Sequence, residues 1–307
     1  MAGQQSSAPE PCPTIVDPWL AFVALIWGGN FVTYKILLTN LPATGLLAVR
    51  FVAVTSLLLL FLWVTGRLRR NEPGMWLRLF LAGVLIMGTQ QLMFVHGLNL
   101  TAAGEGALLF ATAPIFTALM VAITGAEAIT RSSWMGVITA FVGTAMVILG
   151  GREAAEVAHT RITGDILMLG SAVLYALFMV LSKGLMERYG ALKVVSFAYL
   201  FGALVVVPSG AREALAADWA GLRPACWFCL GYLIVLAGVF GFVTWYWRIS
   251  RTSAARVAVY QYLVPVVALI AAAIWLAERP TPIQLLGALL VLTGLVFARL
   301  TPRVACP

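Results

Sequence analysis

The chain has 307 residues, of which 62% are hydrophobic and only 10% are charged. Because a soluble domain carries about 25% charged residues, this composition excludes a soluble protein and places most of the chain in lipid. The formal net charge of +8 is then expected in the loops of a membrane protein. It does not indicate nucleic-acid binding, which needs a basic face on a soluble domain.

The first 17 residues are polar and contain three prolines but no Lys or Arg. A signal peptide begins with basic residues, so we expect residues 1–17 to be a disordered tail.

Ten later segments are apolar enough, or nearly so, to cross a bilayer as helices of about 20 residues. Their continuous apolar runs lack the alternation of a β-barrel, so the predicted fold class is an all-α polytopic membrane protein. The longest connection, 209–225, is predicted to be a surface helix. The predicted spans are 18–38, 43–65, 76–98, 103–124, 133–150, 163–186, 191–208, 226–247, 254–276 and 281–299.

The orientation in the membrane follows from the basic residues. With ten spans, 13 of the 20 Lys and Arg residues fall on the side of the termini and 7 on the other side. Loops rich in Lys and Arg stay in the cytoplasm. We therefore expect both termini in the cytoplasm and the protein in the cytoplasmic (inner) membrane.

The chain carries an internal duplication with an ungapped offset of 151 residues. Each copy, 18–150 and 163–300, holds five predicted helices. Because five is odd, the second copy enters the membrane from the opposite face, as in transporters whose inverted repeats surround a central site. The register pairs Thr101 with Thr252, Pro114 with Pro265, Glu127 with Glu278, Gly136 with Gly287, and Gly143 with Gly294.

Several motifs make the chain similar to a known family. It resembles the EamA-domain branch of the drug/metabolite transporter superfamily over about 18–300. The motifs that carry the resemblance are Trp27-Gly-Gly-Asn-Phe31 with Lys35, Leu46-Ala48-Arg50-Phe51, Pro114 followed by Glu127, and Pro265 followed by Glu278-Arg-Pro280.

The resemblance implies ten helices in two inverted repeats around a central cavity, and export of amino acids, including aromatic ones, or of other metabolites and drugs. One departure is that Tyr175-Ala-Leu-Phe178 stands where the first copy has Trp27-Gly-Gly-Asn30. We therefore expect an asymmetric site.

The cost of burying polar groups in lipid selects the candidate site residues. An amide without a partner in hydrocarbon costs several kcal/mol, so amides must face protein or water. We expect a cavity between the repeats in which amides orient a substrate and aromatic rings stack on it. The predicted substrate-binding residues are Asn30, Gln91, Tyr175, Trp245, Tyr260, Trp27, His96 and Gln261.

Other residues leave two interpretations open. Gly28 and Gly29 form either a packing face alone or a hinge or substrate contact. His96 is either a proton relay or a packing residue. Pro114 and Pro265 are predicted mid-helix hinges, because proline removes a backbone hydrogen bond.

Four charged residues are also ambiguous. Lys35 and Lys183 either reach toward the headgroups or offer a counter-charge to a substrate carboxylate. For Arg50, pairing or snorkelling is favoured over substrate contact. Glu105 is a loop-end charge or, with less support, part of a gate.

The sequence gives no sign of catalysis. Cys226-Trp-Phe-Cys229 lacks a second Cys or His pair for a metal, so packing is favoured over a metal or redox role. Nucleotide-binding and catalytic motifs are absent, which predicts secondary transport with no enzyme activity, cofactor or metal.

The leading interpretation is therefore an alternating-access exporter of small organic metabolites. Among these metabolites, aromatic or other neutral amino acids are the favoured substrates. The alternatives are transport of other metabolites or cationic drugs, or a non-transporting membrane scaffold with a dry apolar interior. The coupling ion, the direction of transport and the oligomeric state stay open.

Overall fold

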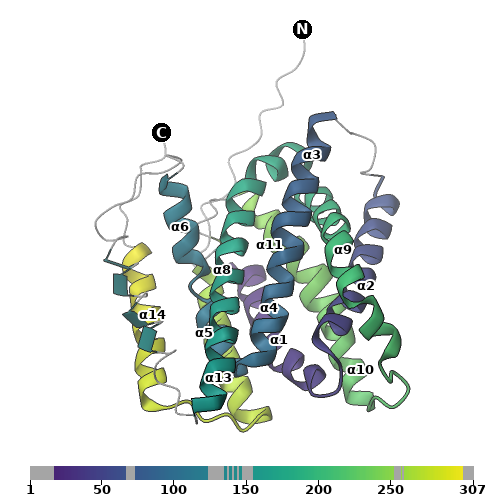
Figure 1. Cartoon of the computed structure of the whole chain (residues 1–307). Coiled ribbons are helices and arrows are strands. Elements are labelled where there is room, and N and C mark those ends of the chain that lie inside the picture. The colour runs from purple at the N-terminus through teal and green to yellow at the C-terminus, as the bar shows by residue number, and fades with distance from the viewer. Residues whose placement is uncertain are drawn as a thin grey trace.

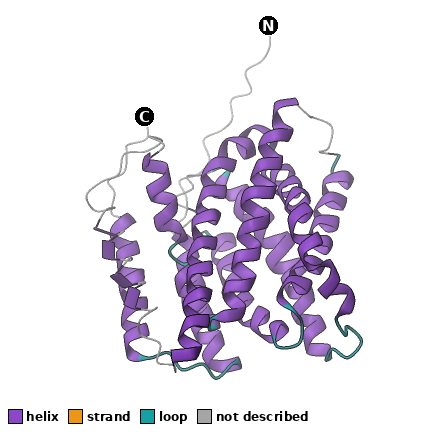
Figure 2. Cartoon of the chain, viewed as in Figure 1, coloured by secondary structure: helices purple, strands orange, loops and turns teal. Residues whose placement is uncertain are grey.

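The computed structural model describes residues 17–66, 73–123, 135–136, 138–139, 142–143, 145–146, 155–251, 257 and 259–299. Every secondary-structure element assigned within these ranges is a helix (Figure 2). The expectation of an all-α protein is confirmed for this part of the chain.

Seven of the helical segments are long and apolar enough to cross a membrane. Two shorter apolar helices follow them in the chain, Leu263–Trp275 and Pro282–Gly294. The predicted span 133–150 lies largely outside the described residues, so the count of ten spans stays a prediction. The seven long segments are Pro18–Leu38, Ala43–Val64, Met75–Leu100, Ala103–Ile123, Thr160–Tyr189, Ala191–Ala216 and Pro224–Ile249.

Two of the long segments contain a π-helical stretch in the middle. In the first, η2 (Ala82–Gly88) joins α3 (Pro73–Leu81) to α4 (Thr89–Leu100). Its counterpart η3 (Tyr232–Gly241) lies at an offset of about 151 residues, in register with the sequence duplication. π-helical turns are rare and frequently occur at functional sites.

The flanking helices of the second π-helical stretch are α10 (Pro224–Gly231) and α11 (Phe242–Ile249). They complete one segment from Pro224 to Ile249.

The two prolines of the duplication lie at breaks between helices. The chain turns at 111–112 between α5 (Ala103–Phe110) and α6 (Ala113–Ile123), so Pro114 is the second residue of α6. Proline is favoured in a first turn, where its missing N–H is not needed. Pro114 thus lies in the middle of the segment Ala103–Ile123, directly after a break between two helices, and its role as a hinge stays a prediction.

Pro265 has a similar place. It is the third residue of α13 (Leu263–Trp275), which follows the 3₁₀-helical turn η4 (Val259–Tyr262). Pro265 therefore also lies in a first turn, just after a change of helix type. The start of its predicted span, 254–276, lies largely outside the described residues, so its role as a mid-helix hinge stays a prediction.

The central pair of helices is longer than the sequence predicts. Helix α8 (Ala155–Tyr189) spans 35 residues, and α9 (Ala191–Ala216) continues past Pro208. The prediction of a separate surface helix at 209–225 is wrong, because residues 209–216 belong to α9. This extension is held against α2 (Ala43–Val64), where Glu213 accepts a hydrogen bond from the Gly45 N–H at 3.1 Å.

The helices form one bundle in which the two halves of the chain interlock (Figure 1). Helix α2 packs along α9, α4 along α8, and α1 (Pro18–Leu38) along α13. The final helix, α14 (Pro282–Arg299), lies at one edge of the bundle in this view, and its Ala288 packs with Leu108 of α5 and Leu269 of α13. Each of the three main contacts thus joins the first half of the chain to the second.

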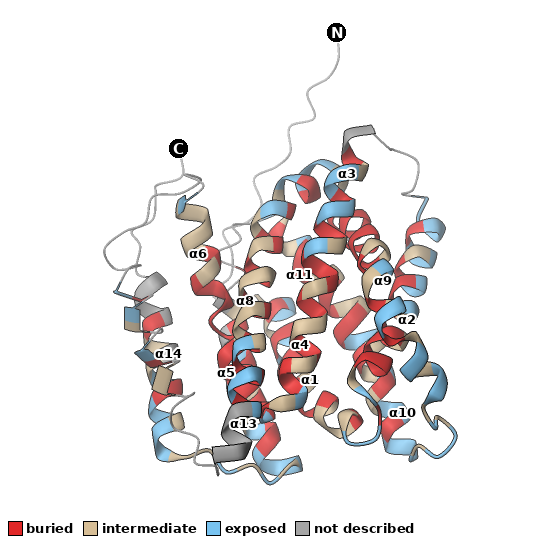
Figure 3. Ribbon diagram, viewed as in Figure 1, coloured by how far each residue is buried: buried red, intermediate tan, exposed pale blue. Residues whose placement is uncertain are grey.

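The outer surface of the bundle is rich in large apolar side chains. Leu60, Trp63 and Ile274 are each more than half exposed. Buried residues lie on the helix faces that point inward, and exposed ones lie on the outside (Figure 3). Apolar side chains over such a surface suit contact with lipid rather than water.

Candidate functional site

A cavity lies in the interior of the bundle, bordered by both halves of the chain. The space open to the centres of water molecules is about 50 Å³, and one water needs about 10–15 Å³. The cavity therefore has room for several waters or a small polar group. Its lining residues are Trp27, Asn30, Arg50, Gln90, Gln91, Phe94, Phe110, Ala111, Tyr175, Ala237, Phe242, Gln261 and Val264.

Arg50 brings a positive charge to this cavity. Its residue surface is only 2% exposed. Nη1 donates a hydrogen bond to Gln91 Oε1 at 2.9 Å, and Nε donates to the Leu233 carbonyl at 3.3 Å. None of the ion pairs within the described residues involves Arg50.

The expected pairing of Arg50 is met by an amide and a carbonyl rather than by an acid. Its place in the cavity lining was missed by the sequence interpretation, which favoured pairing or snorkelling over substrate contact. The one available signal was the high cost of a charge inside a span.

Amide side chains form most of the remaining polar lining, together with the hydroxyl of Tyr175. Gln91 Nε2 donates to Gln90 Oε1 at 2.8 Å. Asn30 Oδ1, Gln90 Nε2 and both polar atoms of the Gln261 side chain are buried without a hydrogen-bond partner among the described residues. A buried polar atom left unpaired costs about 1–3 kcal/mol, so these groups are suited to binding water or a polar ligand.

Aromatic rings form the apolar wall of the cavity. Trp27 donates from Nε1 to the Ala237 carbonyl at 3.2 Å, which fixes the plane of its ring. Phe110 packs against Phe94 at 5.4 Å and against Tyr175 at 5.3 Å between ring centres. These rings come from both halves of the chain and offer flat surfaces for an apolar group.

Five of the eight predicted site residues line the cavity. They come from α1, α4, α8 and η4, and they are Trp27, Asn30, Gln91, Tyr175 and Gln261.

The other three predicted residues lie outside the lining. Trp245 is fully buried behind Trp27, with 4.8 Å between ring centres. The Tyr260 hydroxyl accepts a hydrogen bond from the Asp17 N–H at 2.6 Å, at the start of α1. His96 is partly exposed on α4.

The second copy of the duplication contributes less polar surface to the cavity than the first. Phe178, which stands where the first copy has Asn30, is buried and packs edge-on against Tyr246 at 5.4 Å. Asn30 itself borders the cavity. This agrees with the asymmetry expected from the departure in the family motif.

The two glycines of α1 allow close contact with neighbouring helices. A Cβ on Gly28 would lie 2.4 Å from Val267 Cβ of α13, and a Cβ on Gly29 would lie 2.7 Å from the Tyr232 hydroxyl. Such close approach supports the packing interpretation of this pair.

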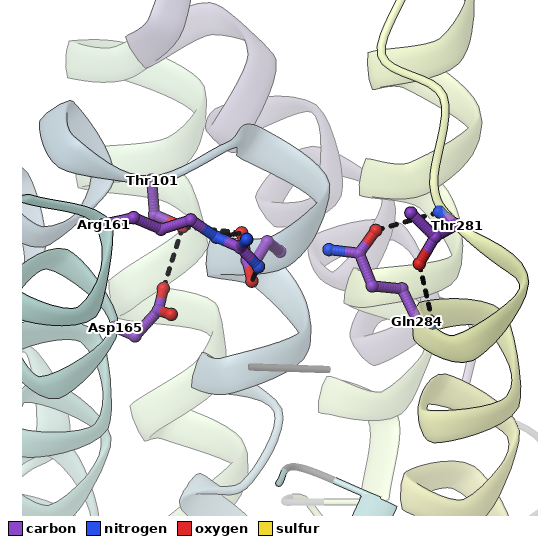
Figure 4. Close-up of polar contacts among 6 residues, drawn as sticks. Thr101, Arg161, Asp165, Thr281 and Gln284 are labelled. Atoms are coloured by element: carbon purple, nitrogen blue, oxygen red, sulfur yellow. Dashed lines mark hydrogen bonds and ion pairs between the residues drawn. The ribbon is translucent and has the colours of Figure 1, made fainter. Parts of the chain in front are cut away.

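A buried ionic cluster lies at the end of the bundle where α4 ends and α5 begins (Figure 4). Arg161 Nε donates to Glu105 Oε2 at 2.9 Å, and a second contact pairs Arg161 with the other carboxylate oxygen. Thr101 Oγ1 lies 3.1 Å from Glu105 Oε2 and 3.0 Å from Asp165 Oδ1. Because a hydroxyl has one hydrogen, Thr101 donates to one of these carboxylates at a time.

Glu105 lies in the first turn of α5, at the loop end of its helix as the sequence favoured, but it is only 5% exposed and is paired with Arg161. Arg256, its counterpart in the duplication, lies outside the described residues.

The same view shows a cap on the last helix. Thr281 and Gln284 exchange hydrogen bonds at the start of α14, with Thr281 N donating to Gln284 Oε1 at 2.9 Å (Figure 4). This is the reciprocal arrangement of a capping box.

Lys35 and Asp17 lie at opposite ends of α1. Lys35 Nζ donates to the Asn99 carbonyl at 3.4 Å, outside the cavity lining. Asp17 forms an ion pair with Arg248 at the other end. Polar contacts thus join helices at both ends of the bundle, with the cavity in between.

Metal-ligand clusters are not found in the part of the chain that the structure describes. No group of three or more His, Cys, Asp or Glu side chains there could hold a metal ion. Cys226 and Cys229 are free, with Cys226 buried and Cys229 partly buried. The groups that the cavity lining offers to a ligand are amides, aromatic rings and one guanidinium.

Comparison with known proteins assigns the chain to a family. The EamA-like transporter family matches residues 14–149 and again 162–300. The chain belongs to this family. It is therefore a multi-pass membrane transporter that lies in a lipid bilayer and binds small-molecule substrates.

Similar curated proteins carry transporter names. An "Uncharacterized transporter" of Archaeoglobus fulgidus is 29% identical over 90% of this chain and 94% of its own length. A "Probable terminal-alkyne amino-acid exporter" of Streptantibioticus cattleyicolor is 28% identical over 90% and 91%. A "Probable amino-acid metabolite efflux pump" of Escherichia coli is 27% identical over 89% and 91%.

A solved crystal structure has a similar fold, with a TM-score of 0.66 and 18% identity over 92% of this chain and 96% of the other. Its likeness concerns the fold alone.

Proposed function

We propose that this EamA-family protein is a secondary transporter that exports small organic metabolites, with aromatic or other neutral amino acids as its substrates. The cavity in the bundle interior is the substrate site. The two halves of the bundle rock against each other, so that the cavity opens to one face of the membrane and then to the other. Substrate crosses the membrane in this way without chemical change.

The observation that carries this proposal is the mixed lining of the cavity. Unpaired amide atoms of Asn30 and Gln261 lie in the same lining as the rings of Trp27 and Phe110. A pocket of apolar walls with a few polar groups is typical of small-molecule sites. A non-transporting scaffold would instead have a dry, uniformly apolar interior.

The names of two relatives support amino acids as the substrate class. The similar proteins of Streptantibioticus cattleyicolor and Escherichia coli are named as an exporter and an efflux pump in connection with amino acids. The flat aromatic walls suit a substrate with a sizeable apolar side chain.

The proposed mechanism rests on two inverted repeats of five helices each. Two family matches to one chain and two π-helical segments in register with the duplication support it. The excess of basic residues on the side of the termini supports a cytoplasmic location for both ends in the inner membrane. The lack of a nucleotide-binding motif favours gradients as the energy source.

Export of a cationic drug is the weaker alternative, because Arg50 places a positive charge in the cavity without an acidic partner among the described residues. A cation would meet repulsion there.

Counterflow by the purified protein in liposomes tests the proposal. Vesicles loaded with unlabelled phenylalanine, threonine or a quaternary ammonium drug are diluted into the matching labelled compound. We expect transient accumulation of labelled phenylalanine above that of protein-free vesicles. Absence of counterflow with every amino acid would overturn the proposed substrate class, and accumulation of the drug alone would favour the alternative.

A further inference from the structure

We propose that Arg50 is the carboxylate-binding group of this transporter, so that the cavity selects substrates that carry a carboxylate and rejects amines that lack one. The proposal rests on the proposed function and names the group that would recognise the acidic end of the substrate. It concerns a residue for which the sequence analysis favoured pairing or snorkelling over substrate contact.

The first argument is the unused hydrogen-bonding capacity of Arg50. A guanidinium carries five N–H donors in a rigid fork. The structure uses one on Nε, to the Leu233 carbonyl, and one on Nη1, to Gln91. The hydroxyls of Tyr34 and Tyr199 lie close to the guanidinium, but both are neutral and neither meets the geometry of a hydrogen bond with a described residue. The remaining N–H groups are therefore available to a ligand that competes with these hydroxyls. Paired N–H groups of this kind match the two oxygens of a carboxylate.

The second argument is charge balance. Arg50 is 2% exposed and forms no ion pair with a described residue. Its aromatic neighbours, Tyr34 and Tyr199, are neutral, and the guanidinium carbon lies 5.6 Å from the centre of the Tyr34 ring. A buried charge without a counter-charge costs several kcal/mol. A substrate carboxylate that enters the cavity would supply the missing negative charge.

The third argument is that the fold holds Arg50 in place before any ligand binds. Leu233, whose carbonyl accepts from Nε, belongs to the π-helical segment η3. Gln91, which accepts from Nη1, is itself bonded to Gln90. Two fixed acceptors from different segments orient the fork, which reduces the entropy lost when a carboxylate binds.

The unpaired acceptors in the cavity lining suit the other end of an amino acid. Asn30 Oδ1 and Gln261 Oε1 are buried acceptors without a donor among the described residues. They come from α1 and η4, whereas Arg50 comes from α2. A zwitterion would place its carboxylate on Arg50 and its ammonium group on these acceptors.

A ligand series on the purified full chain tests the proposal. Thermal unfolding in detergent is measured with phenylalanine, with 3-phenylpropionate, which lacks the amine, and with 2-phenylethylamine, which lacks the carboxylate. We expect the first two to raise the unfolding midpoint of the wild type and the third to leave it unchanged. An equal shift from 2-phenylethylamine and phenylalanine would overturn the role of Arg50.

Variants give the second arm of the test. Arg50→Gln keeps a polar side chain, and we expect it to weaken binding of phenylalanine and 3-phenylpropionate by roughly tenfold or more. Arg50→Lys keeps the charge but loses the fork, so its affinity should be intermediate. Arg212→Gln, at an exposed position on α9, is the matched control.

The outcomes separate the two proposals. If the wild type carries phenylalanine in counterflow and folded Arg50→Gln or Arg50→Lys binds it with wild-type affinity, the role of Arg50 is wrong and the proposed function stands. If the wild type neither binds nor transports any carboxylate of the series, both fall.

Discussion

The Glu278 carboxylate accepts a hydrogen bond from the backbone N–H of Ala103, at 2.8 Å, across 175 residues of sequence. Its other oxygen accepts from the Gly104 N–H at 3.0 Å. Helix α5 starts after Ala102 and has no side-chain cap of its own. A residue from the second half of the chain therefore caps a helix of the first half. Glu105 lies in the first turn of the same helix.

Removing this cap should destabilise the protein. We expect Glu278→Ala to lower the free energy of unfolding by about 0.5–2 kcal/mol, because two N–H groups and the positive end of a helix lose their partner. Thermal unfolding in detergent measures the effect. Glu187→Ala is the control, because Glu187 forms only an exposed pair with Lys183 four residues away, worth about 0.5 kcal/mol or less. Equal midpoints for the two variants would show that the cap has no energetic role.

A methyl group on Gly28 should separate two helices. Its Cβ would lie 2.4 Å from Val267 Cβ, so Gly28→Ala requires α1 and α13 to move apart. Overpacking of this kind costs about 1–3 kcal/mol, and we expect transport to fall with stability. Gly184→Ala is the matched control on α8, because nothing lies within 4 Å of its added Cβ. That control should be neutral or slightly stabilising, since alanine favours helix over glycine.

The buried ion pair between Arg161 and Glu105 should be sensitive to loss of its cation. Arg161→Met leaves the buried carboxylate of Glu105 without this partner, and breaking such a pair costs about 3–5 kcal/mol. Lys183→Met removes a cation from a surface pair and should cost under about 1 kcal/mol. Denaturant or thermal unfolding of both variants makes the comparison. A smaller loss for Arg161→Met than for Lys183→Met would contradict the assigned role of this cluster.

The ring of Trp27 should matter more for aromatic substrates than for small ones. An aromatic pair contributes about 0.5–1.5 kcal/mol beyond burial, so Trp27→Leu should raise the half-saturating phenylalanine concentration by about 2–10-fold. Threonine has no ring, and its value should change by less than about twofold. Trp227→Leu, half exposed on α10, is the control. Equal changes for the two amino acids would remove Trp27 from the aromatic wall.

Some of this site could be read from the sequence, because membrane burial gives polar residues a high cost. That cost placed Asn30, Gln91 and Gln261 at an interior site, and all three border the cavity. The ends of the first two helices were also readable, because apolar runs predicted 18–38 and 43–65 and the structure has Pro18–Leu38 and Ala43–Val64.

The direction in which a side chain points was harder to predict. Lipid and protein interior are both apolar, so α2 gives no sign of which face Arg50 occupies. Tyr260 and Gln261 are neighbours in sequence, but in the tight turn of η4 Gln261 reaches the cavity while Tyr260 contacts Asp17. Pro114 and Pro265 did indicate where the helices are interrupted, but not how the two parts of each interrupted segment pack, which hydropathy does not report.

The most direct test of the central claim, that the interior cavity is the transport site, is phenylalanine counterflow by liposomes containing equal amounts of wild type, Gln91→Ala or Leu60→Ala. Gln91 borders the cavity and holds Arg50, whereas Leu60 is 53% exposed on the outer face of α2. We predict that Gln91→Ala lowers the initial rate by roughly tenfold or more, in line with loss of a hydrogen bond to a charged group, while Leu60→Ala keeps the wild-type rate. Equal rates for the two variants would contradict the claim.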